Sequence, residues 1–209
     1  MSARDAVLGA VRDALGPGRQ DPPGRAVPAS ADNAVPAPAT ATAEERAAML
    51  DLFAERVADY RATVTRCAAV ELAAAIAVAL DGERPVVDAG LDVDVPGAVV
   101  DDRSLSYAEL DAVAAVVTTS AVGVALTGTV VLDHGPGQGR RVITLLPDLH
   151  VCVVREDQVV PDVPDALARL DPGRPQTWIS GPSATSDIEL SRVEGVHGPR
   201  RLHVVIVGG

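Results

Sequence analysis

Lysine is absent from the chain, and all 18 of its basic residues are arginine. Without a lysine amine the chain cannot form a Schiff base, anchor pyridoxal phosphate or build a Walker-type phosphate loop. Codon bias in a GC-rich genome explains the preference for arginine, and the chemical exclusion holds whatever its origin.

Aromatic residues are also scarce, at 2% of the chain, and the formal net charge is −11. Proteins that bind nucleic acid usually present a basic stripe, and many add aromatic side chains that stack on bases. The sequence has neither feature, so we expect no nucleic-acid partner. The acidic excess is concentrated in residues 50–120, which hold 13 acidic residues and 5 arginines. This half forms either a docking face for a basic partner or a solvated surface.

Potential metal ligands and redox groups are few. Cys67 and Cys152 are the only cysteines, whereas an iron–sulfur cluster needs about four thiolates. The four histidines are scattered, without the spacing of a zinc site, and no flavin or nicotinamide fingerprint is present. We therefore expect no metal and no cofactor bound by this chain alone.

The beginning of the chain lacks the apolar core of a signal peptide, and no apolar run approaches the length of a membrane span. We expect a cytoplasmic protein. Apolar residues make up 47% of the sequence, which is enough for a hydrophobic core. Because aromatic residues are scarce, the smaller side chains of Val, Ala, Leu and Ile must build this core, and we expect helices and sheet to pack closely together.

The chain divides into a tail and one α/β domain. Residues 2–15 have the apolar spacing of a short amphipathic helix, and residues 16–43 are a linker rich in proline and alanine. Residues 44–209 form the domain. The short helix docks either on its own domain or on a partner.

The domain alternates helical and strand patterns, which favours a parallel sheet. Thr42 and Glu45 predict a capping box, and Ser106 with Glu109 predicts another. We expect a buried helix over 70–80, a short helix over 163–170 and another over 186–191. We expect strands over 62–66, 85–88, 113–118, 177–180 and 202–207. Four closely spaced strands, over 122–126, 129–132, 141–145 and 151–155, suit antiparallel hairpins.

The first candidate site is the segment from Ser180 to Glu189, in which small and hydroxyl residues stand between two apolar runs. A turn of this kind that opens a helix aims several backbone N–H groups at one point, which suits a phosphate or carboxylate. The candidate ligand-binding residues are Ser180, Gly181, Ser183, Thr185 and Ser186. A well-capped turn without a ligand is the alternative.

The second candidate is the turn Glu194-Gly195-Val196-His197-Gly198-Pro199. Glu194 suits a general base or a nucleophile, and His197 suits a base or a ligand-binding residue, so these two are the candidate catalytic residues. A tight turn with surface side chains explains the same pattern.

The third candidate combines a Thr-Gly-Thr segment with a glycine-rich loop over 133–141. The glycines permit unusual backbone dihedral angles, and the following arginine pair, Arg140 and Arg141, suits an anion. A flexible hairpin tip is the alternative. The candidate residues here are Thr127, Gly128, Thr129, Gly137, Gln138, Gly139 and Arg140.

In this order these segments, with Leu146-Pro147-Asp148-Leu149-His150, resemble the lactate utilization protein C family, whose unit is called the LUD domain. The resemblance covers about residues 45–207. It implies α/β architecture: a Rossmann-like, mostly parallel sheet of the type found in ribose-5-phosphate isomerase, glucosamine-phosphate deaminase and CoA transferases (the NagB/RpiA/CoA-transferase-like type), here with an antiparallel hairpin extension. Ligands of such sheets usually lie beyond the carboxyl ends of the strands, and we expect the glycine-rich loops to gather there.

The resemblance also implies a function, since the family takes part in oxidising L-lactate to pyruvate together with cysteine-rich iron–sulfur proteins. The chain is then an accessory subunit of that system, with the clusters on its partners and a small carboxylate, a phosphate or a partner surface at the glycine-rich loops. Two alternatives stay open: an independent CoA-transferase-like or sugar-phosphate-isomerase-like enzyme, with Glu194 as base or nucleophile, and a non-catalytic small-molecule sensor.

Overall fold

The computed structural model describes residues 42–185, 193–194 and 198–208. The predicted helix over 2–15, nearly all of the predicted linker and the predicted helix over 186–191 lie outside these residues. No helix in the described ranges has the length and apolar character needed to cross a membrane.

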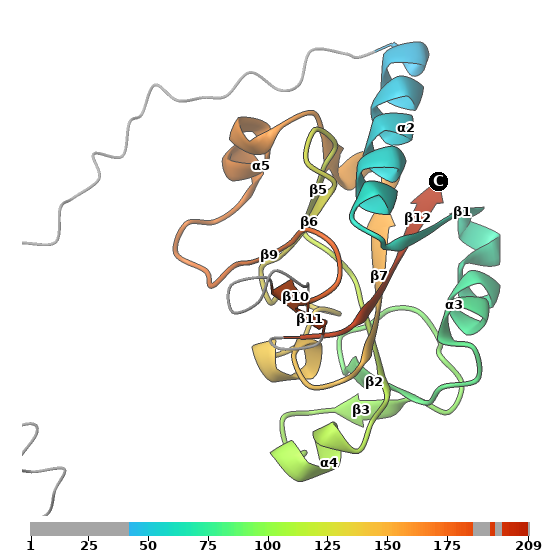
Figure 1. The fold of residues 1–209 in the computed structure, drawn as a ribbon, viewed down its shortest axis with the longest axis vertical. Coiled ribbons are helices and arrows are strands. Elements are labelled where there is room, and N and C mark those ends of the chain that lie inside the picture. Colours follow the sequence, from blue (N-terminus) through green and yellow to red (C-terminus); the bar gives the residue numbers. More distant parts are fainter. Residues whose placement is uncertain (1–41, 186–192, 195–197, 209) are drawn as a thin grey trace, which may run out of the picture. The chain divides into compact units, whose positions relative to one another are not determined.

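A six-stranded, all-parallel sheet forms the centre of the fold (Figure 1). Its strand order is β1-β12-β7-β4-β2-β3. The strands are β1 (Thr63–Ala68), β2 (Pro85–Asp88), β3 (Val99–Asp101), β4 (Ala115–Thr118), β7 (Leu149–Arg155) and β12 (Arg201–Gly208). The expected α/β fold with a mostly parallel sheet is therefore confirmed, although the short strand β3 was not predicted.

A second sheet of four short strands, in the order β8-β5-β6-β9, extends the fold. These strands are β5 (Val122–Val124), β6 (Thr129–Leu132), β8 (Val159–Val160) and β9 (Thr177–Ile179). β6 pairs antiparallel with β5 and with β9, which confirms the hairpin extension. Strand β7 is not part of it, because β7 pairs in parallel with β4 and β12 in the central sheet.

The strand predicted over residues 141–145 is wrong, because Arg141–Thr144 forms a 3₁₀ helix, η2. The β-branched Val142-Ile143-Thr144 sequence favours a strand locally. Two other interactions override this preference. The side chain of Ile143 is fully buried against Val86 and Val116, and the Thr144 hydroxyl donates a hydrogen bond to the Arg141 carbonyl at 3.0 Å.

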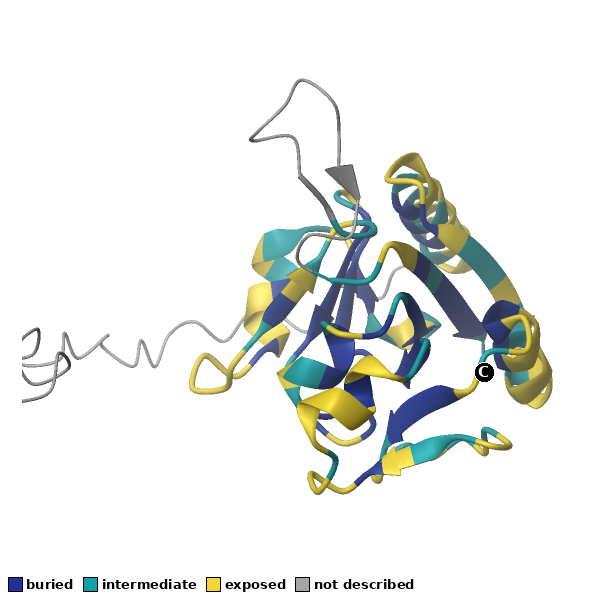
Figure 2. Ribbon diagram, turned by 60° about the horizontal axis from the view of Figure 1, so that its bottom comes forward, coloured by how far each residue is buried: buried dark blue, intermediate teal, exposed yellow. Residues whose placement is uncertain are grey.

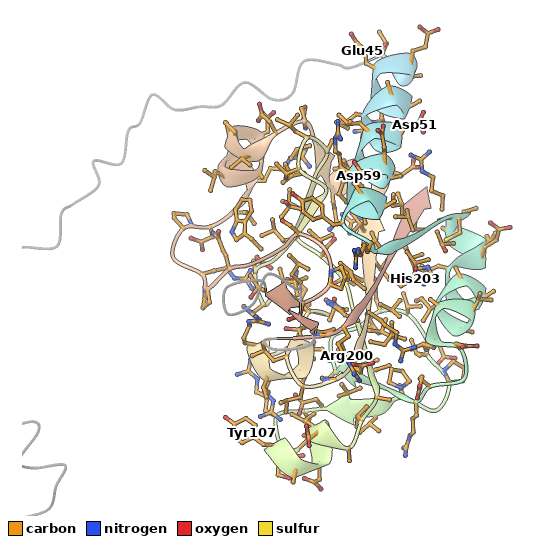
Figure 3. The ribbon with its side chains drawn as sticks, viewed as in Figure 1. Glu45, Asp51, Asp59, Tyr107, Arg200 and His203 are labelled. Carbon is orange, nitrogen blue, oxygen red and sulfur yellow. The ribbon has the colours of Figure 1, made fainter. Side chains whose placement is uncertain are left out.

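Both predicted capping boxes form. At the start of α2 (Ala43–Asp59), the Glu45 amide donates to the Thr42 hydroxyl, and the Thr42 amide donates back to the Glu45 carboxylate at 2.8 Å. Figure 3 labels Glu45, Asp51 and Asp59 along this helix. Ser106 and Glu109 cap α4 (Tyr107–Asp111) in the same way.

Helix α3 (Leu72–Leu80), which follows the 3₁₀ helix η1 (Ala69–Glu71), is buried on one face only. Ile76 and Leu80 pack on the central sheet, whereas Val78 is 78% exposed and Val70, just before the helix, is 94% exposed. The prediction of a buried helix over 70–80 is therefore correct for one face and wrong for the other.

The elements stack in four layers around buried strands (Figure 2). α3 covers one face of the central sheet, and α2 with the small sheet covers the other. The outer face of the small sheet packs against α5 (Val163–Arg169). Two further pairs of residues, β10 (Ala184–Thr185) and β11 (Val193–Glu194), form a short antiparallel ladder, and the 3₁₀ helix η3 (Glu156–Gln158) follows β7.

Glycines allow the small sheet to approach α2 closely. Phe53, the only phenylalanine, is fully buried, and its ring lies where a Cβ on Gly123 would come within 3.0 Å. At the β5–β6 turn, a Cβ on Gly128 would lie 2.5 Å from the carbonyl carbon of Arg56, and the φ angle of Gly128 is +59°. The hairpin therefore rests directly on the backbone of α2.

We predict that Gly128→Ala lowers the free energy of unfolding by about 3 kcal/mol, because it adds a clash with helix backbone to the cost of a positive φ angle. Gly82→Ala is the matched control, since Gly82 also has a positive φ angle but nothing within 4 Å of its Cβ position. The control should cost only about 1 kcal/mol. Urea unfolding of both variants measures the difference, and equal losses would contradict the close contact with α2.

Candidate functional site

A cleft of about 700 Å³ lies at the carboxyl ends of the parallel strands and is called here the carboxyl-edge cleft. This is the edge at which open α/β sheets usually bind ligands. The cleft lies between the starts of α2 and α3 and the segments that follow β2, β4 and β7. Its polar and charged lining residues are Arg46, Asp92, Thr119, Ser120, Gln138, Arg155, Glu156, Asp157 and Gln158.

The glycine-rich loop over 135–139 lies at this cleft, as predicted. The carboxylate of Asp88, at the end of β2, accepts hydrogen bonds from the amides of Gly90 and Gly137 at 2.9 and 3.0 Å. Gly137 and Gly139 have positive φ angles, and the carbonyl of Gly137 accepts from the Thr119 amide. The loop is thus fixed to the ends of β2 and β4.

Gln138 lines the cleft, but it is only 4% exposed, and its side chain stabilises the loop. Its side-chain carbonyl accepts hydrogen bonds from the amides of Asp133 and His134, at 2.7 and 3.1 Å. His134 in turn bonds the Gly139 carbonyl through Nδ1. This inner network holds the loop in shape without a ligand.

The charges of the carboxyl-edge cleft do not favour an anion. Arg155 pairs with Asp157, and Arg46 donates to the carbonyl of Glu156. Three carboxylates, those of Asp92, Glu156 and Asp157, line the cleft against these two arginines. A neutral polar ligand suits this lining better than a carboxylate or a phosphate.

Arg140, predicted to bind an anion, has a partner within the fold. Its guanidinium donates to both carboxylate oxygens of Asp101, at 2.7 and 3.0 Å, and to the Leu105 carbonyl at 2.6 Å. Asp101 is almost completely buried, and this bidentate pair raises the pKa of Arg140. The pair joins the end of β3 to the glycine-rich loop, which makes Arg140 a structural residue.

The Thr-Gly-Thr segment is connected to the first C-terminal motif by hydroxyl groups. The hydroxyls of Thr127 and Thr129 lie 2.7 Å apart, and that of Thr129 lies 2.8 Å from the hydroxyl of Ser180. Gly181 has a φ angle of +83° and lies against Tyr60, the residue that follows α2. The β5–β6 turn, the end of α2 and the Ser180 turn therefore form one corner of the molecule.

The two C-terminal motifs also lie side by side. The Ser183 amide donates to the Pro199 carbonyl at 2.8 Å, and β10 pairs with β11 so that Ala184 lies opposite Glu194. The side chains of Thr185 and Glu194 are not described, and Ser186 and His197 lie outside the described residues. The backbone of Glu194 is thus near the Ser180 turn, while the chemistry predicted for Glu194 and His197 stays a prediction.

A pocket of about 240 Å³ lies next to these motifs, called here the amino-edge pocket. It is at the edge where β7 and β12 begin, opposite to the carboxyl-edge cleft. The expectation that all glycine-rich loops gather at the carboxyl edge is therefore wrong for the Ser180 turn. The pocket is lined by Arg141, Thr144, His150, Thr177, Trp178, Ile179, Ser180, Gly181, Pro182, Ser183, Gly198, Pro199 and Leu202.

His150 and Arg141 give this pocket its chemistry. His150 is 1% exposed, and its Nε2 lies 2.8 Å from the Thr118 hydroxyl. Burial, together with the nearby charge of Arg141, lowers the pKa of His150 to about 4, so the ring is neutral at pH 7. Partial burial also lowers the pKa of Arg141, which nevertheless keeps its charge at neutral pH.

Sequence reasoning missed His150 and Thr144 as lining residues. Thr144 was placed in a strand that does not exist, and His150 was one of four scattered histidines. A signal was present, because a histidine inside a continuous apolar strand is buried and must find a partner. In the described part of the chain, no cluster of three or more metal-ligating side chains occurs.

We predict that His150 makes the fold sensitive to mild acid. As the pH falls, the His150 imidazole of the unfolded chain, with a pKa near 6.5, is protonated at a higher pH than that of the folded chain, with a pKa of about 4. The free energy of unfolding is therefore highest above pH 6.5 and decreases as the pH drops from 6.5 towards 4. The loss amounts to about 2 kcal/mol between pH 6.5 and 5. Urea unfolding at both pH values should show a smaller difference in His150→Gln than in wild type.

His203 is the control for this measurement. Burial lowers the pKa of His203 too, but this residue is only about half buried, whereas His150 is fully buried. His203→Gln should retain most of the acid sensitivity. An unchanged pH dependence in His150→Gln would contradict a neutral, buried imidazole.

We also predict opposite results for the two neighbouring arginines. Arg140→Ala leaves the Asp101 carboxylate buried without its partner and should lower the free energy of unfolding by about 2–3 kcal/mol. Arg141→Ala removes one side-chain hydrogen bond, to Thr144, and should cost less than about 1 kcal/mol. Denaturant unfolding of both variants tests this difference, and equal costs would disprove it.

Comparison with known proteins places these motifs in a family. Residues 37–207 match the family model described as "LUD domain". Lactate utilization protein C of Deinococcus radiodurans is 48% identical over 195 residues, which cover 88% of this chain and 91% of that protein. Lactate utilization protein C of Geobacillus sp. is 34% identical over 125 residues, and the match spans only 51% of its length.

A solved structure agrees with these matches. The crystal structure of a DUF162 family protein from Deinococcus radiodurans is 44% identical in sequence, with a TM-score of 0.65 over 78% of this chain and 98% of that one. The residues that match the family model include the central sheet almost entirely and both C-terminal motifs, and the chain accordingly belongs to the LUD domain family.

Proposed function

We propose that the chain acts in lactate utilization, as an accessory subunit of a system that oxidises L-lactate to pyruvate. The observation that carries the proposal is the 48% identity to a lactate utilization protein C over nearly the whole length of both chains. Oxidation of lactate requires an electron acceptor, and the proposal assigns that task to cysteine-rich iron–sulfur partner proteins rather than to this chain.

The chemistry of the two cysteines supports this division of labour. Burial raises the pKa of Cys152 to about 12, which keeps its sulfur protonated at neutral pH, whereas a metal ligand must be a thiolate. Burial also raises the pKa of Cys67, and two cysteines fall short of the about four thiolates that a cluster needs. A subunit of this kind contributes binding and positioning.

An independent enzyme of CoA-transferase type is the second candidate. The observation in its favour is the register of β10 and β11, which brings the backbone of Glu194 beside the Ser180 turn. Incubation with acyl-CoA followed by mass spectrometry tests it. A covalent adduct present in wild type and absent in Glu194→Gln would support the enzyme, and no adduct in either would leave the accessory role.

The accessory role predicts that deletion of the gene abolishes growth on L-lactate as the sole carbon source, and that the intact gene restores it. A tagged chain purified from lactate-grown cells should retain cysteine-rich proteins and the brown absorbance of iron–sulfur clusters. Growth on glucose is the control and should not change. Normal growth of the deletion strain on lactate, together with a colourless, partner-free protein, would contradict the proposal.

A further inference from the structure

The amino-edge pocket contains a cation, Arg141, that forms no ion pair with any described residue. Arg140, Arg200 and Arg201 are paired with Asp101 or Asp148. Figure 3 labels Arg200, the residue just before β12. Arg141 differs from these three, because in the described part of the chain no carboxylate lies within ion-pair distance of its guanidinium. Arg141 is exposed to solvent where it lines the pocket, so its guanidinium can donate charge-assisted hydrogen bonds to an anionic ligand.

The guanidinium of Arg141 is held in place but remains available. Its Nη1 donates to the Thr144 hydroxyl at 2.9 Å, and that hydroxyl donates back to the Arg141 carbonyl at 3.0 Å. Arginine has five N–H donors, and this contact uses one of them. The remaining N–H donors of Arg141 can form a bidentate hydrogen bond with a carboxylate.

The rest of the pocket lining suits a small anion. The described lining includes no Asp or Glu, although the chain as a whole has 29 acidic residues. Hydroxyl groups of Ser180 and Thr177 lie along it, and the Ser180 hydroxyl is oriented by its contact with Thr129. His150 adds a neutral ring with hydrogen-bonding nitrogens. The carboxyl-edge cleft lacks this character, because three carboxylates line it.

The size of the pocket limits the ligand. At about 240 Å³ it is smaller than the roughly 300–1,000 Å³ that is usual for drug-sized ligands. A nucleotide or coenzyme A would exceed it, whereas an acid of three or four carbons fits.

We propose that the amino-edge pocket binds a short 2-hydroxy or 2-oxo monocarboxylate, with its carboxylate on Arg141 and its second oxygen on the hydroxyl of Ser180 or the ring of His150. The site itself rests on geometry, and the choice of L-lactate and pyruvate as probes rests on the proposed function. This inference assigns to Arg141 a ligand-binding role, in place of Arg140.

Isothermal titration calorimetry with L-lactate and with pyruvate tests the site, using the full chain. Wild type should bind at least one of them, and Arg141→Gln should weaken binding roughly 10- to 100-fold, the range of a lost charge-assisted hydrogen bond. Ser180→Ala should weaken binding by a smaller factor. Thermal unfolding of each variant confirms that it is folded before the titration.

Arg155→Gln is the matched control, since Arg155 lines the carboxyl-edge cleft and should not affect binding. Propionate, which lacks the second oxygen, should bind more weakly than L-lactate. Four results would overturn the proposal: no binding of either acid to wild type, an equal loss in Arg155→Gln, propionate as tight as lactate, or binding of inorganic phosphate alone. Because growth on lactate is measured separately, a failed titration does not imply failure of the accessory role.

Discussion

The close contact between helix α2 and the small sheet is the constraint on which the other features depend. The chain has few aromatic side chains to fill the space between layers, so the small sheet and α2 must lie close together. At the two points of closest contact, Gly123 beside the Phe53 ring and Gly128 beside the helix backbone, only glycine fits. This contact fixes strand β6. Strand β9 pairs with β6, so the turn after β9, which begins at Ser180, is fixed as well. A side chain at either glycine would separate the small sheet from α2 and displace the Ser180 turn.

The same architecture separates two chemically different hollows at opposite edges of the central sheet. The carboxyl-edge cleft is larger, contains paired charges and is lined by carboxylates. The amino-edge pocket is smaller and contains one arginine without a carboxylate partner among the described residues. In open α/β sheets the carboxyl edge is the usual ligand site. Charge favours the other edge for a small anion in this protein, and the two C-terminal motifs that characterise the sequence lie there.

Local patterns in the sequence predicted much of the fold. The capping boxes at Thr42 and Ser106 and the β5–β6 turn depend on short-range chemistry, and they form, as do the predicted apolar strands other than the one over 141–145. The segment from Arg141 to Thr144 was wrong because its β-branched side chains favour a strand, while burial of Ile143 decides otherwise. The sequence could not show that Arg140 forms an ion pair within the fold, since its partner, Asp101, is 39 residues away and buried at the end of an unpredicted strand.

A crystal structure of the protein grown with L-lactate tests the central claim most directly, because it distinguishes the two edges of the sheet in one experiment. We expect the lactate carboxylate on the guanidinium of Arg141, with the carboxyl-edge cleft free of lactate. Lactate bound beside Thr119 and Gln158 in the cleft, with Arg141 in contact with solvent alone, would contradict the account.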